Sequence, residues 1–174
     1  TYRDVIRYVD VLGRLGDGNG NAVFHNTLAS SDYGLLDENG WKPRPDYWAA
    51  VLWGKLMGPA VLAMDSTSNP PDLAVYAHCT RQAQERSVTY AVVNASATEA
   101  RTVATRSGRA TVYLLTGEAL DATTIALNGK VLTAAEDGTL PPLDGVVADG
   151  AITVPPASVA FVVEPSGGAA CDGV

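Results

Sequence analysis

The sequence predicts an α/β segment followed by a larger all-β domain built as an antiparallel sandwich. Two patterns support this fold class. Near the N-terminus, two stretches with apolar residues at helical spacing flank one short apolar run, and many short β-branched runs separated by turn residues follow. The chain of 174 residues contains 17 Gly and 10 Pro, which favours turn-rich β structure. We place the α/β segment at residues 1–58 and the sandwich at 59–174.

The first predicted element is a helix over residues 1–15. A glycine-rich stretch at 16–21 ends it. The run AVFHNTL at 22–28 then predicts a short buried strand, and a helix, a turn and a strand in this order are typical of a βα unit. The apolar positions that follow one face of the helix are Val5, Ile6, Val9, Leu12 and Leu15.

A second helix is predicted from Pro45 to Met57. Proline is tolerated in the first turn of a helix because the N–H it lacks would have no partner there. The pair Gly58-Pro59 ends the helix. The apolar residues at helical spacing are Tyr47, Trp48, Val51, Leu52, Leu56 and Met57.

The rest of the chain contains a series of short runs that predict strands. Turn pairs such as Asn128-Gly129 and Asp137-Gly138 separate them, and Asn-Gly favours a tight hairpin. Short strands at this spacing predict an antiparallel sandwich. The predicted strands are Leu73–Cys79, Val88–Val93, Arg101–Thr105, Ala110–Leu115, Thr124–Leu127, Ile152–Val154 and Val159–Val163.

The N-terminal segment is not expected to form a domain by itself. A lone strand between two helices with apolar faces leaves both strand edges unpaired. Either further strands complete a barrel around it, or the segment packs against the sandwich. The chain also begins at Thr1, inside the first predicted helix and without an initiator Met. We therefore expect a fragment of a longer protein or a processed chain.

Charge and composition argue against several kinds of partner. The formal net charge is −7, which disfavours nucleic acid because phosphate contacts need basic residues. No run approaches the roughly 18 apolar residues that a membrane-spanning helix needs. The two cysteines, Cys79 and Cys171, are compatible with one disulfide, but two free buried thiols are also common. Spacing alone leaves both possibilities open.

Three groups of residues together resemble one known family. In order and spacing they are similar to the C-terminal half of members of glycoside hydrolase family 79, which contains heparanase and β-glucuronidases. The resemblance covers nearly the whole chain. The first group comprises 32–39 (DYGLLDEN), 45–48 (PDYW) and 52–58 (LWGKLMG), the second is 75–80 (VYAHCT), and the third comprises 127–130, 137–143, 155–163 and 170–171.

The resemblance implies a (β/α)8 barrel joined to a β-sandwich. Residues 1–15 would be barrel helix seven, 22–28 strand eight and 45–57 helix eight. It also implies a secreted enzyme, extracellular or periplasmic, without cofactor or metal. Such an enzyme cleaves β-linked glucuronic acid, as in glucuronides or heparan-sulfate-like glycans, by a retaining mechanism. Cys79 and Cys171 match a disulfide of the family.

No residue of the chain is assigned a catalytic role. A retaining glycosidase needs two carboxyl groups about 5–5.5 Å apart across the scissile bond. Asp37 and Glu38 are adjacent and fit turn and capping chemistry. The remaining glutamates are interpreted as surface charges: Glu85, Glu99, Glu118, Glu136 and Glu164. The resemblance implies that both catalytic Glu residues precede Thr1, on an N-terminal barrel portion that would be the partner of this chain.

The predicted substrate-binding residues are Tyr33, Ser31 and His25. Active sites of such barrels lie at the C-terminal ends of the strands, which for strand eight is the stretch from 25 to 33. Tyr33 matches a family Tyr whose hydroxyl binds the sugar carboxylate, and Ser31 falls where the backbone donor is expected. His25 either lines the pocket or is a core histidine bonded to a neighbouring carbonyl. Asp32 would repel a uronate, so we expect its side chain to point away.

Several chemically suggestive residues have structural interpretations. His78 beside Cys79 is too small a set for a metal site, and adjacent strand residues face opposite sides. Tyr47, Trp48 and Trp53 are expected in the core, whereas Trp41 is left open. Two other functions remain possible: a related retaining β-glycosidase with a neutral substrate, and a non-catalytic carbohydrate-binding sandwich module, which would expose aromatic residues on a sheet face.

Overall fold

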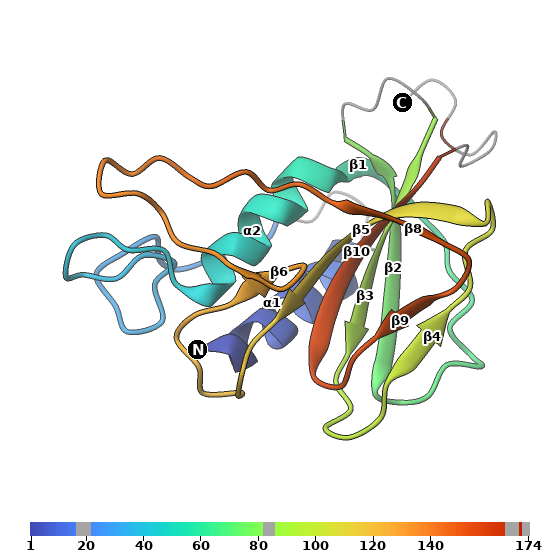
Figure 1. Ribbon diagram of the computed structural model, residues 1–174, viewed down its shortest axis with the longest axis horizontal. Coiled ribbons are helices and arrows are strands. Elements are labelled where there is room, and N and C mark those ends of the chain that lie inside the picture. Colours follow the sequence, from blue (N-terminus) through green and yellow to red (C-terminus); the bar gives the residue numbers. More distant parts are fainter. Residues whose placement is uncertain (17–21, 82–85, 166–170, 172–174) are drawn as a thin grey trace.

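A computed structural model describes residues 1–16, 22–81, 86–165 and 171, and it is dominated by antiparallel sheet with two helices (Figure 1). The helices are α1 (Tyr2–Gly16) and α2 (Pro45–Leu56). The strands are β1 (Met57–Leu62), β2 (Leu73–Thr80), β3 (Val88–Asn94), β4 (Arg101–Val103), β5 (Arg109–Thr116), β6 (Ala126–Leu127), β7 (Lys130–Val131), β8 (Val146–Asp149), β9 (Ile152–Val154) and β10 (Ser158–Glu164).

The strands form one large and one small sheet. The large sheet has the order β1-β2-β3-β10-β5-β6-β7, with β8 also paired to β5, and the small sheet is β4-β9. Strand β10 shows how side chains alternate between the two faces. Val159 and Phe161 enter a core shared with the helices, while Ala160 and Val162 enter a second core with β9. Figure 1 shows the helices and the small sheet on opposite sides of the large sheet.

Both helices pack against the large sheet. Buried residues of α1 and α2 share one apolar cluster with Leu115 of β5 and Phe161 of β10. The hydroxyl of Tyr2 donates hydrogen bonds to the carbonyl oxygens of Leu115 and Ala157, at 3.1 and 2.7 Å, and burial raises its pKa above the usual range. The helix residues in this cluster include Tyr2, Val5, Val9, Trp48, Ala49, Leu52 and Leu56.

The strand predicted at 22–28 does not form among the described residues of this structure. These residues have no regular secondary structure, and Phe24 and Leu28 are 89% and 58% exposed. A strand is stable only when a neighbouring strand pairs with its amide groups, and the described residues place none beside most of this segment. Its end makes backbone hydrogen bonds, in which the carbonyl oxygens of Thr27 and Leu28 accept from the amides of Leu35 and Leu36.

The seven strands predicted after residue 72 all overlap an observed strand, but β1, β7 and β8 were not predicted. Strand β1 begins at Met57, directly after the last helical residue Leu56, so Gly58 and Pro59 lie within the strand. Pro59 is exposed on this strand, which lies at the edge of the sheet, where a missing N–H costs least. The pairing of β1 with β2 is also irregular between Met57 and Val61.

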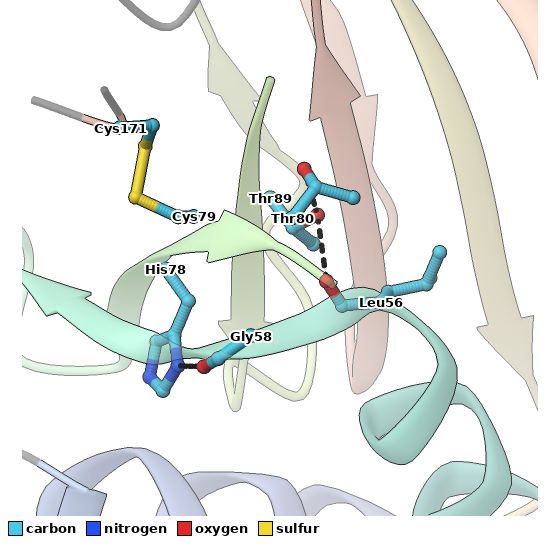
Figure 2. Close-up of a disulfide and its surroundings, with 7 residues drawn as sticks. All are labelled: Leu56, Gly58, His78, Cys79, Thr80, Thr89 and Cys171. Carbon is cyan, nitrogen blue, oxygen red and sulfur yellow. Dashed lines mark hydrogen bonds between the residues drawn. A yellow bond between two sulfur atoms is a disulfide. The ribbon is translucent and has the colours of Figure 1, made fainter. Parts of the chain in front are cut away.

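Cys79 and Cys171 form a disulfide, so the pairing implied by the family is confirmed (Figure 2). His78 leaves β2 on the opposite side from Cys79, as expected for adjacent strand residues. Its Nδ1 donates a hydrogen bond to the carbonyl oxygen of Gly58 at 2.6 Å, and burial lowers its pKa. His78 is therefore a buried neutral histidine at neutral pH. No metal-binding cluster of acidic, His or Cys residues occurs in the described ranges.

Candidate functional site

The candidate site lies in the segment that connects α1 to α2. Residues 22–44 extend away from the large sheet beside α2 (Figure 1, light blue). Tyr33 and Trp41 are 59% and 61% exposed and share this segment with Phe24. Trp48, in contrast, is buried, and Tyr47 and Trp53 pack partly against the core, so the core interpretation of these three is confirmed.

A tight turn presents Tyr33 to solvent. The amide of Gly34 donates to the carbonyl oxygen of Ser31 at 3.0 Å, and the amide of Tyr33 lies 3.4 Å from the Ser31 hydroxyl. Gly34 avoids crowding here, because a Cβ at this position would lie 3.2 Å from both the Cα of Ala29 and the Ser31 carbonyl oxygen. The turn therefore keeps Ser31 and Tyr33 close together.

His25 holds this turn through a hydrogen bond to its backbone. Its Nε2 lies 3.1 Å from the carbonyl oxygen of Tyr33, and because a carbonyl only accepts, Nε2 carries the proton. The imidazole also packs edge-on against the ring of Tyr8, with centroids 5.4 Å apart. The structure thus brings the three predicted residues, His25, Ser31 and Tyr33, into one cluster. His25 is half-buried and bonded to a neighbouring carbonyl.

A buried carboxyl group lies behind His25. Asp46, in the first turn of α2, is 5% exposed, and burial raises its pKa while the charge of His25 acts in the opposite direction. Burial also raises the pKa of the Tyr8 phenol, and the negative charge of Asp46 adds to that effect. Asp46 and Tyr8 were missed from sequence. The signal available for Asp46 was its place directly after Pro45, at the start of a helix.

Arg44 is the second residue that sequence reasoning missed. Its Nη1 donates hydrogen bonds to the carbonyl oxygens of Ser31, at 3.0 Å, and Asp32. Arg44 is the N-cap residue of α2 and has an extended backbone, with φ −83° and ψ 167°. Pro45 favours this conformation, because the proline ring disfavours helical backbone in the residue before it. An arginine between two prolines was therefore the available signal.

The acidic residues separate into surface and structural groups. The carboxylate of Asp37 accepts a hydrogen bond from the amide of Asn39 at 2.5 Å, which confirms turn chemistry. The interpretation of Glu164 as a surface charge is wrong. It is 5% exposed and accepts hydrogen bonds from the amides of Arg106 and Ser107, because the loop before β5 folds over the end of β10. The exposed glutamates are Glu38, Glu99, Glu118 and Glu136, and Glu85 lies outside the described residues.

Comparison with known proteins finds relatives that match most of the chain. No protein-family model matches the chain. Heparanase-like protein 1 from Arabidopsis thaliana is 31% identical, over 95% of this chain and 37% of that protein. Mouse (Mus musculus) heparanase is 35% identical, over 94% of this chain and 33% of its own. A hyaluronoglucuronidase from Hirudo nipponia is 31% identical, over 89% and 34%. The chain spans about a third of the length of these relatives.

Solved structures agree at the level of the fold. A crystal structure of an arabinofuranosidase superimposes with a TM-score of 0.64 at 18% identity, over 93% of this chain and 38% of that chain. The relatives thus place the chain among the glycoside hydrolase families, and the fold agrees with that class. More narrowly, the chain belongs to glycoside hydrolase family 79, the heparanase and β-glucuronidase family, and corresponds to the C-terminal portion of its members.

Proposed function

We propose that the chain is the C-terminal part of an exo- or endo-acting retaining β-glucuronidase that cleaves glucuronic-acid-containing glycans. The two catalytic Glu residues would lie on a barrel portion that precedes Thr1. The match of this chain to a C-terminal third of its relatives supports this placement, and so do the relatives' names, heparanase and hyaluronoglucuronidase.

The observation that carries the proposal is the exposed turn at Tyr33. Its hydroxyl is available to a ligand, because more than half of the residue is exposed and its backbone is fixed by Ser31, Gly34 and His25. A phenol and backbone amides can bind a sugar carboxylate through charge-assisted hydrogen bonds. The described strands, in contrast, expose no strongly accessible aromatic side chain, which disfavours a carbohydrate-binding module on a sheet face.

The barrel assignment belongs to the same proposal. Helix α1 would be helix seven, residues 22–28 strand eight and α2 helix eight, and residues 59–174 would form the sandwich domain. The absence of a paired strand along most of 22–28 in the described residues, and the exposed Phe24 and Leu28, support a segment whose barrel neighbours are on another part of the protein. Pairing with those neighbours would bring Tyr33 to the edge where barrel active sites form.

The disulfide fits an oxidising location. Disulfides persist in secreted, extracellular and periplasmic proteins and are rare in reducing compartments. No helix among the described residues is long and apolar enough to cross a membrane. We propose that the enzyme is secreted and that it needs neither metal nor cofactor.

The test is to assay this chain alone and the full-length protein to which we assign it, using 4-nitrophenyl β-D-glucuronide. We expect hydrolysis by the full-length protein, with the anomeric configuration retained, and none by residues 1–174 alone. Hydrolysis by the chain alone would overturn the placement of the catalytic pair. A full-length protein that cleaves 4-nitrophenyl β-D-glucoside but not the glucuronide would instead establish the neutral β-glycosidase.

A further inference from the structure

Arg44 fixes the backbone on both sides of Asp32. One guanidinium nitrogen, Nη1, donates to the carbonyl oxygens of Ser31 and Asp32, two consecutive peptide groups. Arg44 is half-buried, and its own backbone is constrained by Pro45 and by a hydrogen bond from its amide to the carbonyl oxygen of Leu35 at 2.9 Å. The guanidinium is therefore held in place from the start of α2 and not from the turn that it contacts.

This contact determines where the two amide groups point. Both peptide bonds are trans, so each N–H lies opposite the carbonyl of the preceding residue. When the carbonyls of Ser31 and Asp32 face Arg44, the amides of Asp32 and Tyr33 face away from it. The Tyr33 amide on this side donates to the Ser31 hydroxyl at 3.4 Å, so the Asp32 amide is the one of the two that is directed to a ligand. The Tyr33 hydroxyl belongs to the same turn and adds a second donor for an anion.

The charge of Arg44 also acts in favour of an anionic ligand. Hydrogen bonds from a guanidinium polarise the two peptide groups, which makes their N–H groups stronger donors. The turn carries a negative side chain, Asp32, which would repel a uronate. A guanidinium bonded to the backbone of the same residue offsets part of this repulsion. Ser31 has a Cβ where a glycine would allow closer approach, so the orientation of the amides matters more in this chain.

We propose that Arg44 is a positioning residue for recognition of the substrate carboxylate. It orients the amide of Asp32 and the backbone that carries the Tyr33 ring toward the sugar, without touching the substrate itself. This role rests on the proposed function, because it assumes that the ligand of this turn is a uronate.

The test measures KM and kcat for 4-nitrophenyl β-D-glucuronide in the full-length protein. Arg44→Leu is expected to raise KM about 10- to 100-fold with kcat changed less than about threefold, because the lost interaction serves binding of the carboxylate. Arg44→Lys should recover part of the loss, since an ammonium supplies charge and one donor but not the guanidinium geometry. Lys42→Leu is the matched control, which removes an exposed cation from the same segment and should change KM less than about twofold.

A double-mutant cycle with Tyr33→Phe separates positioning from an independent effect. If Arg44 acts through the turn, the KM increase of the double variant is smaller than the product of the two single increases. An increase equal to that product, an unchanged KM for Arg44→Leu, or the same change for Lys42→Leu overturns the proposal. Thermal unfolding of Arg44→Leu identifies a variant that merely fails to fold, and Arg44→Lys then provides the decisive comparison.

Failure of the proposed function gives a different result. In that case the wild-type protein does not cleave the glucuronide at all, and the role of Arg44 falls with it. If the wild-type protein cleaves the glucuronide and Arg44→Leu binds it equally well, only the role of Arg44 is refuted.

Discussion

The disulfide between Cys79 and Cys171 is predicted to be a major source of stability. The two residues are 92 positions apart, so the bond joins β2 to the last residues of the chain. In the chain-entropy relation, closing a loop of this length restricts the unfolded state by about 4.6 kcal/mol at 25 °C. That amount is a large part of the roughly 5–15 kcal/mol by which a domain is stable.

The perturbation is the double variant Cys79→Ser, Cys171→Ser, compared with wild type by urea unfolding of residues 1–174. With a slope of about 2 kcal/mol per molar urea, a loss of about 4 kcal/mol lowers the midpoint by about 2 M. The slope itself should rise, because the unfolded chain without the bond exposes more surface. A reducing agent provides the control, since it should lower the midpoint of wild type and leave the double variant unchanged. A free-energy loss below about 1 kcal/mol would refute the loop-closure reasoning.

Two further predictions concern buried polar groups. Tyr2→Phe removes the hydroxyl that bonds to Leu115 and Ala157, and should lower the free energy of unfolding by about 1–3 kcal/mol in urea titrations, whereas the exposed Tyr33→Phe should change it by less than about 0.5 kcal/mol. Burial lowers the pKa of His78 below its ordinary 6.5, so the unfolded chain binds this proton more readily than the folded chain. The contribution of His78 to the free energy of unfolding is therefore complete above pH 6.5. It declines as the pH falls from there through the folded-state pKa, by at most about 1.4 kcal/mol per pH unit. His78→Gln should remove this part of the slope and His25→Gln should retain it, as measured by urea unfolding from pH 7.5 to 5.

Each of these predictions has a clear contrary result. Equal stability of wild type and Tyr2→Phe would mean that the hydroxyl contributes nothing beyond its bonds to water. An unchanged slope in His78→Gln would assign the pH dependence to the carboxyl groups. The pH dependence that Asp46 contributes to stability has the opposite sign, because its raised pKa means that protonation at low pH favours the folded state.

Sequence patterns predicted a helix or strand correctly where the element that packs against it is a regular helix or strand of this chain. Strand β10 alternates between two apolar cores and was predicted from Val159 to Val163, and α2 was predicted to within a residue from its apolar spacing and Pro45. The segment at 22–28 has an apolar pattern of the same kind, but nothing in the described residues pairs with most of it. An apolar pattern indicates only a preference for extended structure, whereas a stable strand also requires a neighbouring strand that pairs with its backbone.

The site was predictable only in part, for a related reason. Tyr33, Ser31 and His25 were found through a resemblance in the order of residues, and the structure places them together. Arg44 and Asp46 act through contacts with residues about 12 to 21 positions away, and only the folded turn reveals them. The same holds for Glu164, whose amide partners lie 57 and 58 positions earlier.

The central claim is that this chain meets a sugar carboxylate at Tyr33. The most direct measurement compares wild type and Tyr33→Phe in the full-length protein, using kcat/KM for 4-nitrophenyl β-D-glucuronide and for the neutral 4-nitrophenyl β-D-glucoside. Loss of one hydrogen bond to a charged group predicts a decrease of about 10- to 100-fold for the glucuronide, and less than about threefold for the glucoside. Equal decreases for both substrates, or no decrease for the glucuronide, would contradict the account.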